Sequence, residues 1–379
     1  MGMIGGGEGA FIGGVHRIAA ALDQQVDLVA GVFSRDAANS SATGQRLFLD
    51  PARIYRTYEE MAEREAALPA DRRVDFITIV TPNHVHFGPA KTFLEHGFHV
   101  ICDKPLTTTV DEARQLAEIV DRTQLVFAVT YNYTGYPLVR HAKQLFRSGS
   151  MGVVRKVLVE YLQGWLVQPE EKRGSKQAAW RTNPAESGVG GALGDIGTHA
   201  LHLAEYVTGD AVIELCADKS IFLPDRTLDE DANVLLRFRG GGKGMLTVSQ
   251  IATGEENALR LRAYASEGAI LWEQENPNYL KLYRHGEPRQ TLTRGRTEYL
   301  VPEAMAGTRI PWGHPEGYLE AFANIYLGAI HAIRCHVDGR PLPMSEYDFP
   351  TVHDGRRGVQ FIHGAVQSAN AGGVWVKLQ

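Results

Sequence analysis

Cysteine is scarce in this sequence, and the few cysteines lie far apart. Among 379 residues there are only Cys102, Cys216 and Cys335. An odd number of cysteines at such spacing makes neither a disulfide framework nor a C-x-x-C metal site. We therefore expect three free thiols, as in a protein of the reducing cytoplasm.

Long hydrophobic runs and an excess of one charge are absent as well. No stretch reaches about 18 consecutive apolar residues, so no transmembrane helix is predicted. The N-terminus has no basic segment and no A-x-A-like cleavage site, so no signal peptide is expected. The 39 basic and 44 acidic residues give a net charge of −5, without a large block of one sign. This balance argues against a protein that binds nucleic acid or an anionic membrane, whose surface would be basic.

The first third of the chain alternates strand-like and helix-like patterns. At about 150 residues per domain, the length suggests two domains, and neither repeats nor a low-complexity linker are present. The near-continuous apolar run at 74–80 is typical of a parallel sheet covered on both faces. Residues 1–130 are therefore predicted to form a doubly wound α/β Rossmann domain that binds NAD(P). Strands are expected at 1–4, 26–33, 74–80, 98–102 and 125–130, with a very short one at 54–55, and helices at 11–22, 57–67, 84–96 and 109–122.

After residue 131 the pattern becomes rich in strands. A helix is expected at 138–146, followed by strands at 153–163, 212–222, 233–239, 245–251, 259–265, 269–272 and 279–283. The glycine-rich segment 239–244 lacks the order of a phosphate-binding P-loop and is interpreted as a hairpin turn. Residues 131–379 are therefore predicted to form an α+β domain with a large open, mostly antiparallel sheet. An open sheet leaves one apolar face uncovered, and such faces usually mark interfaces, so this domain is also expected to serve oligomerisation.

A glycine motif follows the first strand. Gly5-x-Gly7-x-x-Ala10 lies between a strand and a helix, as the dinucleotide fingerprint requires. Gly5 permits a tight turn, Gly7 lets the backbone approach a pyrophosphate, and Ala10 lets helix and strand pack closely. Either the strand before the motif is only four residues long, or the native chain begins upstream of Met1.

The end of the second strand bears on the choice between NAD and NADP. An acidic residue about 20 positions past the glycines ordinarily binds the ribose hydroxyls of NAD. Here Ser34 and Arg35 occupy that region, and a hydroxyl beside a guanidinium suits the 2′-phosphate of NADP. This favours NADP, although Asp36 would restore a preference for NAD if the strand ended one or two residues later.

Two further loops lie at the carboxyl ends of predicted parallel strands, where ligands bind in such sheets. The loop at 81–86 could also be a plain turn in which Asn83 caps a helix. The lysine of the loop at 103–105 could be an ordinary surface lysine. As cofactor-binding residues in these loops we predict Thr81, Pro82, Asn83, His86, Asp103 and Lys104.

Asp195, His199, His202 and Tyr206 are spaced four, three and four residues apart in a predicted helix that ends near Gly209. They therefore share one face of that helix. A solvated helix face is the plainer alternative. A zinc site is another, but no second cluster completes the ligand shell, so no metal is expected.

Three elements together resemble the glucose–fructose oxidoreductase/inositol dehydrogenase (Gfo/Idh/MocA) family. They are the Gly-x-Gly turn, Asp103-Lys104-Pro105 in place of the usual Glu-Lys-Pro, and the segment from Gly194 to His199. The resemblance implies an NAD(P)-dependent enzyme that oxidises or reduces a carbinol of a sugar or cyclitol, commonly as a homodimer or homotetramer. It implies that Lys104 is the active-site lysine, His199 the general acid/base and Asp195 its partner.

A hydroxylated substrate needs hydrogen-bonding side chains and some aromatic surface. The residues predicted to bind it are Tyr133, Gln163, Trp165, Arg181 and His202. Two other functions stay open. One is redox-assisted glycosidase or lyase chemistry with bound NAD, and the other is a non-catalytic dinucleotide sensor. A sensor would be expected to lack Lys104 or His199, and both are present.

Overall fold

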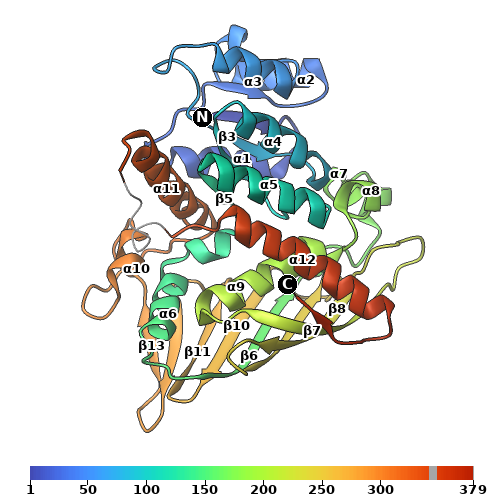
Figure 1. Cartoon of the computed structure of the whole chain (residues 1–379). Helices are drawn as coiled ribbons and strands as arrows, with labels where there is room; N and C mark the ends of the chain where they lie inside the picture. Colours follow the sequence, from blue (N-terminus) through green and yellow to red (C-terminus); the bar gives the residue numbers. More distant parts are fainter. Residues whose placement is uncertain (341–347, 379) are drawn as a thin grey trace. The chain divides into compact units, whose positions relative to one another are not determined.

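The computed structural model describes residues 1–340 and 348–378. The chain forms two compact units (Figure 1). One contains Met1–Tyr131 and Phe322–Arg356, and the other contains Asn132–Ala321 and the chain from Arg357 onward. The segment Phe322–Arg356 thus belongs to the first unit, whereas the sequence interpretation placed it in the second. Among the described residues, no helix is long and apolar enough to cross a membrane.

The first unit holds a parallel sheet whose described strands have the order β2-β1-β3-β4-β5. The predicted doubly wound α/β architecture is confirmed. Because β1 pairs with β2 on one side and with β3 on the other, the chain changes direction at β1, and ligands bind at the carboxyl ends of such strands. The strands are β1 (Gly2–Gly5), β2 (Ala30–Val32), β3 (Phe76–Val80), β4 (His99–Cys102) and β5 (Phe127–Val129).

Five α-helices of the first unit, among its described residues, connect these strands: α1 (Phe11–Ala21), α2 (Ala37–Arg46), α3 (Tyr58–Ala66), α4 (Phe87–Glu95) and α5 (Val110–Thr123). Thr57 and Thr109 cap α3 and α5, because their hydroxyl oxygens accept hydrogen bonds from the amides of Glu60 and Glu112. Helix α2 was not predicted. The strand expected at 26–33 is only three residues long, and Ile54 forms just an isolated bridge with Gly31.

Helix α11 (Tyr318–Val337) begins in the second unit and belongs to the first unit from Phe322 onward. A buried polar contact holds this later part of the helix. The Tyr326 hydroxyl lies 2.9 Å from Nδ1 of His16 and 3.1 Å from Oγ1 of Thr78. Burial lowers the pKa of His16 to about 4 and raises the pKa of Tyr326. A helix distant in sequence therefore covers α1 and β3.

The second unit is built on a large open sheet. Its described strands have the order β13-β12-β11-β10-β6-β9-β8-β7-β14, and β6 and β9 are parallel while the other pairs are antiparallel. The strands are β6 (Val154–Leu162), β7 (Val212–Ser220), β8 (Asp231–Phe238), β9 (Lys243–Ser249), β10 (Ala258–Ala265), β11 (Gly268–Glu273), β12 (Tyr279–Arg284), β13 (Gln290–Thr293) and β14 (Val376–Lys377). The predicted mostly antiparallel sheet is confirmed, and so is the hairpin between β8 and β9.

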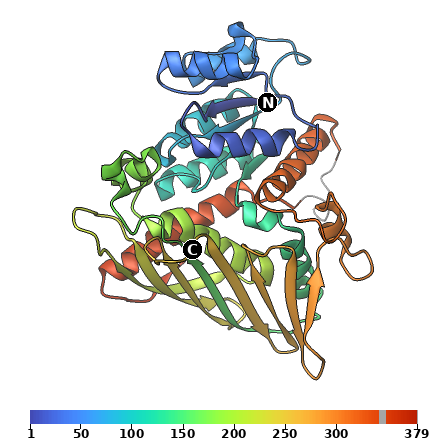
Figure 2. The same cartoon turned by 180° about the vertical axis from the view of Figure 1, so that it is seen from behind.

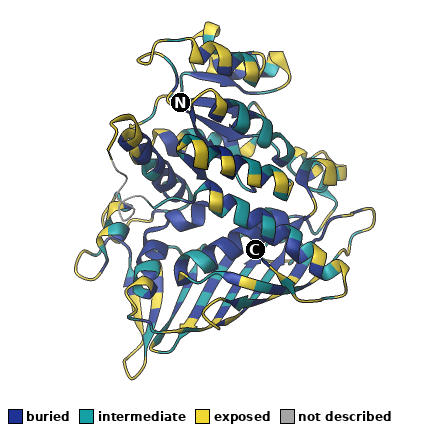
Figure 3. Cartoon of the chain, in the orientation of Figure 1, coloured by how far each residue is buried: buried dark blue, intermediate teal, exposed yellow. Residues whose placement is uncertain are grey.

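Helices cover one face of this sheet, and the other face is open. In Figure 2 the strands face the viewer and the helices lie behind them. Along β10, Leu259, Leu261 and Ala263 are buried under the helices, while Tyr264 on the open face is 41% exposed. Figure 3 shows the same alternation along the strands. The helices of this unit are α6 (Pro137–Arg147), α7 (Lys176–Arg181), α8 (Pro184–Ser187), α9 (Thr198–Thr208), α10 (Pro302–Ala306) and the part of α12 (Val352–Asn370) after Arg356.

Candidate active site

The loop between β1 and α1 requires glycine at several positions. Gly5 has a φ of +88°, and a Cβ there would lie 2.8 Å from the Val80 carbonyl oxygen. A Cβ on Gly7 would lie 2.8 Å from the Phe33 carbonyl oxygen, to which the Gly7 amide donates at 3.0 Å. Both glycines thus let the backbone lie close to the neighbouring strand ends.

Gly13 performs the packing role that the sequence interpretation assigned to Ala10. A Cβ on Gly13 would lie only 2.3 Å from the Cα of Gly6, so the first turn of α1 touches the glycine loop there. Ala10 instead is the residue before α1, and its amide donates to the Gly7 carbonyl oxygen at 3.0 Å. The adjacent glycines at 13 and 14, inside a helix, were the sequence signal for this contact.

A cavity of about 230 Å³ adjoins this loop and has the features of a dinucleotide site. Helix α1 has no side-chain cap and no acidic residue in its first turn, so its N-terminus suits an anionic phosphate. The residues therefore fit a dinucleotide. The predicted residues that line the cavity are Gly5, Gly7, Ala10, Ser34, Arg35, Thr81 and Pro82.

After β2, Arg35 is exposed beside the cavity, whereas the side chain of Asp36 is hydrogen-bonded to the first turn of α2. Oδ1 of Asp36 accepts from the Ala38 amide at 2.9 Å and so caps α2. The hydroxyl oxygen of Ser34 accepts from the Asp36 amide at 3.1 Å. Asn39, which the sequence interpretation missed, lines the cavity and accepts from the Glu8 amide at 3.0 Å. Its signal was faint, since asparagine is common on exposed helix turns.

His86 joins two loops and does not line the cavity. Its Nδ1 lies 2.8 Å from the Pro105 carbonyl oxygen, and its Nε2 lies 2.9 Å from the Thr81 carbonyl oxygen. Burial lowers the pKa of His86, although these carbonyl oxygens oppose the shift. Asn83 is buried at the start of a 3₁₀ turn, Asn83–Val85. The assignment of Asn83 and His86 to the cofactor site stays a prediction.

Asp103 organises the turn that carries Lys104. Its Oδ1 accepts from the Lys104 amide at 2.8 Å and from the Thr130 hydroxyl at 2.9 Å. The Lys104–Pro105 peptide bond is cis. Asp103 thus binds the ends of β4 and β5 together, directly beside the lysine.

In the second unit, a buried carboxylate anchors the segment before α9. The carboxylate of Asp229 accepts from the amides of Gly191 and Leu193, each at 2.7 Å. Its backbone oxygen accepts from the Ala192 amide at 2.8 Å. The chain then forms a π-helical turn, Leu193–Gly197, that continues into α9. Such turns are frequent at functional sites. The sequence interpretation missed Asp229, because nothing local marks it as a partner of residues nearly 40 positions away.

Asp195 lies in the π-helical turn and is held by two side chains. Its Oδ2 accepts from Nε of Arg181 at 3.1 Å and from Nε2 of Gln250 at 2.8 Å. His199, one turn later, is only 6% exposed, and its ring centre lies 4.8 Å from that of Tyr133. The polar helix face predicted from the spacing therefore points into the protein.

The alternative of a solvated helix face is wrong, because His202 is also only 8% exposed. Its ring centre lies 5.9 Å from that of Tyr206, and the Lys143 ammonium lies 4.1 Å from the Tyr206 ring centre. Within the described residues, no group of three or more His, Cys, Asp or Glu side chains could hold a metal ion.

A chain of hydrogen bonds runs from Tyr133 to Trp165. The hydroxyls of Tyr133 and Tyr161 are hydrogen-bonded, and Tyr161 donates to Oδ1 of Asn257 at 2.7 Å. Gln163 donates to the same Oδ1 at 2.8 Å and accepts from the Trp165 indole at 3.0 Å. Because each hydroxyl has one hydrogen, Tyr133 donates to Tyr161. Burial raises the pKa of Tyr133 to about 12.

This chain connects most of the predicted substrate residues. Tyr133, Gln163 and Trp165 belong to it, and the Arg181 guanidinium lies 5.9 Å from the Trp165 ring centre. Asn257 and Gln250 complete the arrangement and were missed. Each is a polar residue directly beside a strand of the sheet, one just before β10 and the other just after β9. That position was the available signal.

Comparisons with known proteins identify the family of this chain. Residues 1–131 match the oxidoreductase family with an NAD-binding Rossmann fold, and residues 139–271 match the GFO/IDH/MocA C-terminal domain. An uncharacterized oxidoreductase, YfiI of Bacillus subtilis, is 33% identical over all of this chain and 96% of its own length. The chain belongs to the Gfo/Idh/MocA family. It is therefore an oxidoreductase with an NAD-binding Rossmann fold.

Two further proteins that are similar to this chain have names or bound ligands that bear on its substrate. The solved inositol dehydrogenase homolog from Azotobacter vinelandii, in complex with NAD⁺, is 35% identical and has a TM-score of 0.95, covering 99% of this chain and 96% of that one. The same homolog has been solved with NADH and myo-inositol. Levoglucosan dehydrogenase from Pseudarthrobacter phenanthrenivorans is 26% identical over 93% of this chain and 97% of its own length.

Proposed function

We propose that this protein is an NAD(P)-dependent dehydrogenase that interconverts a carbinol and a carbonyl of a sugar or cyclitol. The observation that carries the proposal is the buried His199, packed on Tyr133 beside a chain of hydroxyl, amide and indole groups. Such groups suit a polyhydroxylated molecule. The relatives that bind myo-inositol or act on levoglucosan support the same substrate class.

The coenzyme would be held by the glycine loop, by the N-terminus of α1 and by the residues around Ser34. When bound, a nicotinamide coenzyme accepts or supplies the hydride. Because Asp36 caps α2, it is not directed at a ribose, while Arg35 lines the cavity. We therefore propose that the site accepts NADP, with Arg35 as the partner of the 2′-phosphate. The NAD⁺ of the solved relative makes NAD the comparison to test.

Side chains of the protein would transfer the proton of the reacting hydroxyl and stabilise the charge that develops on its oxygen. His199 takes the proton of the reacting hydroxyl during oxidation and returns it during reduction, since imidazoles exchange protons near neutral pH. Arg181 and Gln250 keep Asp195 in place one helical turn away. Tyr133 uses its hydrogen toward Tyr161, so its oxygen can accept from a substrate hydroxyl. Lys104, by its family motif, would stabilise the charge that develops on the reacting oxygen.

The first experiment follows the absorbance of the reduced coenzyme with NAD and NADP. The panel contains myo-inositol, levoglucosan, D-xylose, D-glucose and aryl glycosides. We expect net coenzyme reduction with at least one sugar or cyclitol. Release of an aglycone without net reduction would instead indicate the redox-assisted glycosidase, and no reaction with coenzyme binding intact would indicate a sensor.

Two variants test the assigned roles. Lys104→Met should keep coenzyme binding, measured by fluorescence, and lower kcat by about a hundredfold or more. His199→Ala should lower kcat by about 10²–10⁴-fold and remove the rise of the oxidation rate with pH near neutrality. The half-buried Lys91, which pairs with Glu95 on the surface of α4, and the exposed His285 provide the controls Lys91→Met and His285→Ala, which should keep normal turnover. Near-normal activity of the test variants would reject their roles.

We also propose that the open sheet face forms a homodimer or homotetramer. Leu235 is 50% exposed on that face and Tyr264 is 41% exposed, and exposed apolar surface often marks an interface. Light scattering should give a multiple of the single-chain mass at micromolar concentration. A single-chain mass would refute this.

A further inference from the structure

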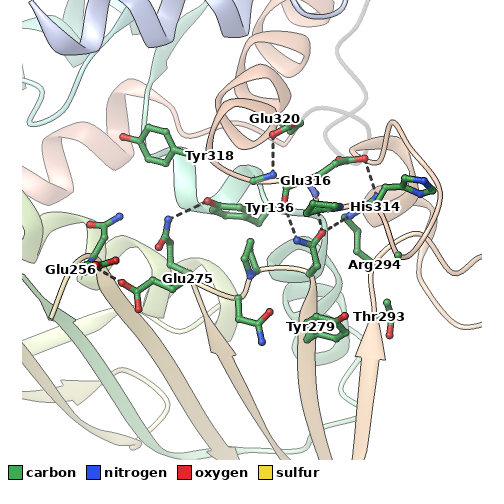
Figure 4. Close-up of a pocket in the computed structure, with 18 residues that line it drawn as sticks. Tyr136, Glu256, Glu275, Tyr279, Thr293, Arg294, His314, Glu316, Tyr318 and Glu320 are labelled. Atoms are coloured by element: carbon green, nitrogen blue, oxygen red, sulfur yellow. Dashed lines mark hydrogen bonds and ion pairs between the residues drawn. The ribbon is translucent and has the colours of Figure 1, made fainter. Parts of the chain in front are cut away.

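The second unit contains a cavity of about 780 Å³ that begins beside the hydrogen-bond chain from Tyr133 to Trp165 (Figure 4). Asn257 lines this cavity and also accepts from Tyr161. Tyr136 lines it and stacks on Tyr133, with ring centres 6.4 Å apart and an interplanar angle of 9°. Two stacked rings, Tyr136 and then Tyr133, therefore lie between this part of the cavity and the candidate catalytic histidine, while Asn257 borders both the cavity and the hydrogen-bond chain.

The lining of the cavity is polar. Amides, hydroxyls and carboxylates surround it, and Figure 4 shows Glu256 and Glu275 at one end and Arg294 and His314 at the other. Gln274 donates to the Tyr136 hydroxyl at 3.4 Å, while its Oε1 has no hydrogen-bond partner among the described residues. A volume within about 300–1,000 Å³ encloses a whole small molecule. The cavity thus has room for a complete sugar unit and groups that bond to hydroxyls.

The charges of the lining disfavour an anion. Arg294 is buried and donates to Glu316 at 2.9 Å and to Oδ1 of Asn278 at 2.6 Å. Its guanidinium is therefore paired with other residues of the cavity wall. Glu256, Glu275 and Glu320 also line the cavity and add negative charge. A carboxylate on the ligand would meet these groups at close range and be repelled.

We propose that this cavity is a second subsite, which binds an uncharged sugar unit joined to the sugar or cyclitol that reacts at His199. The inference rests on the proposed function and extends it from monomers to glycosides and disaccharides. Asn257 and Tyr136 connect the two subsites, because each contacts the hydrogen-bond chain on one side and the cavity on the other. Recognition of the second unit then adds to the binding of the first.

The experiment compares matched pairs of substrates: myo-inositol with galactinol, levoglucosan with cellobiosan, and D-glucose with cellobiose. For at least one pair, kcat/KM should be about tenfold or more higher for the extended member. Cellobiouronic acid, the anionic analogue of cellobiose, should be used about tenfold less well than cellobiose. Replacing Glu256 and Glu275 by glutamine together should narrow that difference.

Thr293 and Thr291 provide a matched pair of variants on β13. Thr293 lines the cavity, and Thr291 lies two residues before it on the same strand, outside the cavity. Thr293→Trp should fill the cavity. The kcat/KM of the extended substrate divided by that of its parent sugar should then fall by about fivefold or more. Thr291→Trp should leave this ratio unchanged. Calorimetric titration of cellobiose and galactinol into the protein without coenzyme gives a readout independent of turnover, and Thr293→Trp should weaken that binding.

The outcomes separate the two proposals. If the parent sugars are oxidised but no extended member is preferred, or if Thr293→Trp affects both members equally, the subsite is rejected and the proposed function stands. If no member of any pair is oxidised, the proposed function fails. In that case, binding of cellobiose or galactinol that Thr293→Trp abolishes would still support a sugar site in the cavity, and its absence would reject it.

Discussion

Asp229 should control both the stability of the second unit and the position of Asp195. Its carboxylate accepts from two buried amides, those of Gly191 and Leu193, at 2.7 Å each. A hydrogen bond to a charged group contributes about 1.5–3 kcal/mol. Asp229→Asn removes the acceptor of one amide and should lower the free energy of unfolding by about 1.5–3 kcal/mol, whereas Asp229→Ala removes both and should cost about 3–6 kcal/mol.

The loss expected for Asp229→Asn lies below the total stability of a typical domain, about 5–15 kcal/mol, so this variant should still fold. A loss of 1 kcal/mol lowers Tm by about 2–4 °C for a unit of this size, so Asp229→Asn should melt roughly 3–12 °C lower. The turn that carries Asp195 should also become less ordered. Hydrogen exchange at residues 190–197 should accelerate, and kcat should fall by about tenfold to a hundredfold.

Asp225 provides the control for this prediction. It lies four residues earlier, is exposed, and pairs with Lys172 at 2.8 Å on the surface. Surface ion pairs contribute about 0–1 kcal/mol, so Asp225→Asn should change little. If Asp229→Asn melts like Asp225→Asn and leaves hydrogen exchange at 190–197 unchanged, the anchoring role of Asp229 is refuted.

Three further predictions follow from single contacts. Gly191→Ala should lower the free energy of unfolding by about 1–3 kcal/mol in a denaturant melt, because its Cβ would lie 2.1 Å from a backbone oxygen. Gly194→Ala, with open space around its Cβ, should leave the free energy of unfolding nearly unchanged. Equal losses for the two variants would contradict this reasoning. Arg35→Ala should raise KM for NADP about tenfold to a hundredfold and leave that for NAD nearly unchanged, while equal losses would indicate stacking on the shared adenine. Burial lowers the pKa of His16 to about 4, so between that pH and about 6.5 the unfolded chain binds more protons than the folded one. Stability should rise with pH across this window and be lost on acidification, and His16→Gln should flatten the dependence of Tm on pH; an unchanged slope would argue against it.

The sequence predicted the parts of this protein that depend on neighbouring residues. Strand and helix alternation and the turn between β8 and β9 appear as predicted, and Thr57 and Thr109 cap two of the predicted helices. These features follow from periodicity and from side chains that bond to backbone three residues away. The helical spacing likewise placed Asp195 and His199 on one face.

Tertiary structure decided which way those groups face and what holds them. His199 is buried against Tyr133, 66 positions earlier, and Asp195 is held by Gln250, 55 positions later. Residues 322–340 and 348–356 belong to the first unit, with contacts such as that of Tyr326 with His16, over 300 positions apart. Local patterns set the shape of each element, but a buried polar group needs a partner, and in this fold those partners come from strands and loops far along the chain.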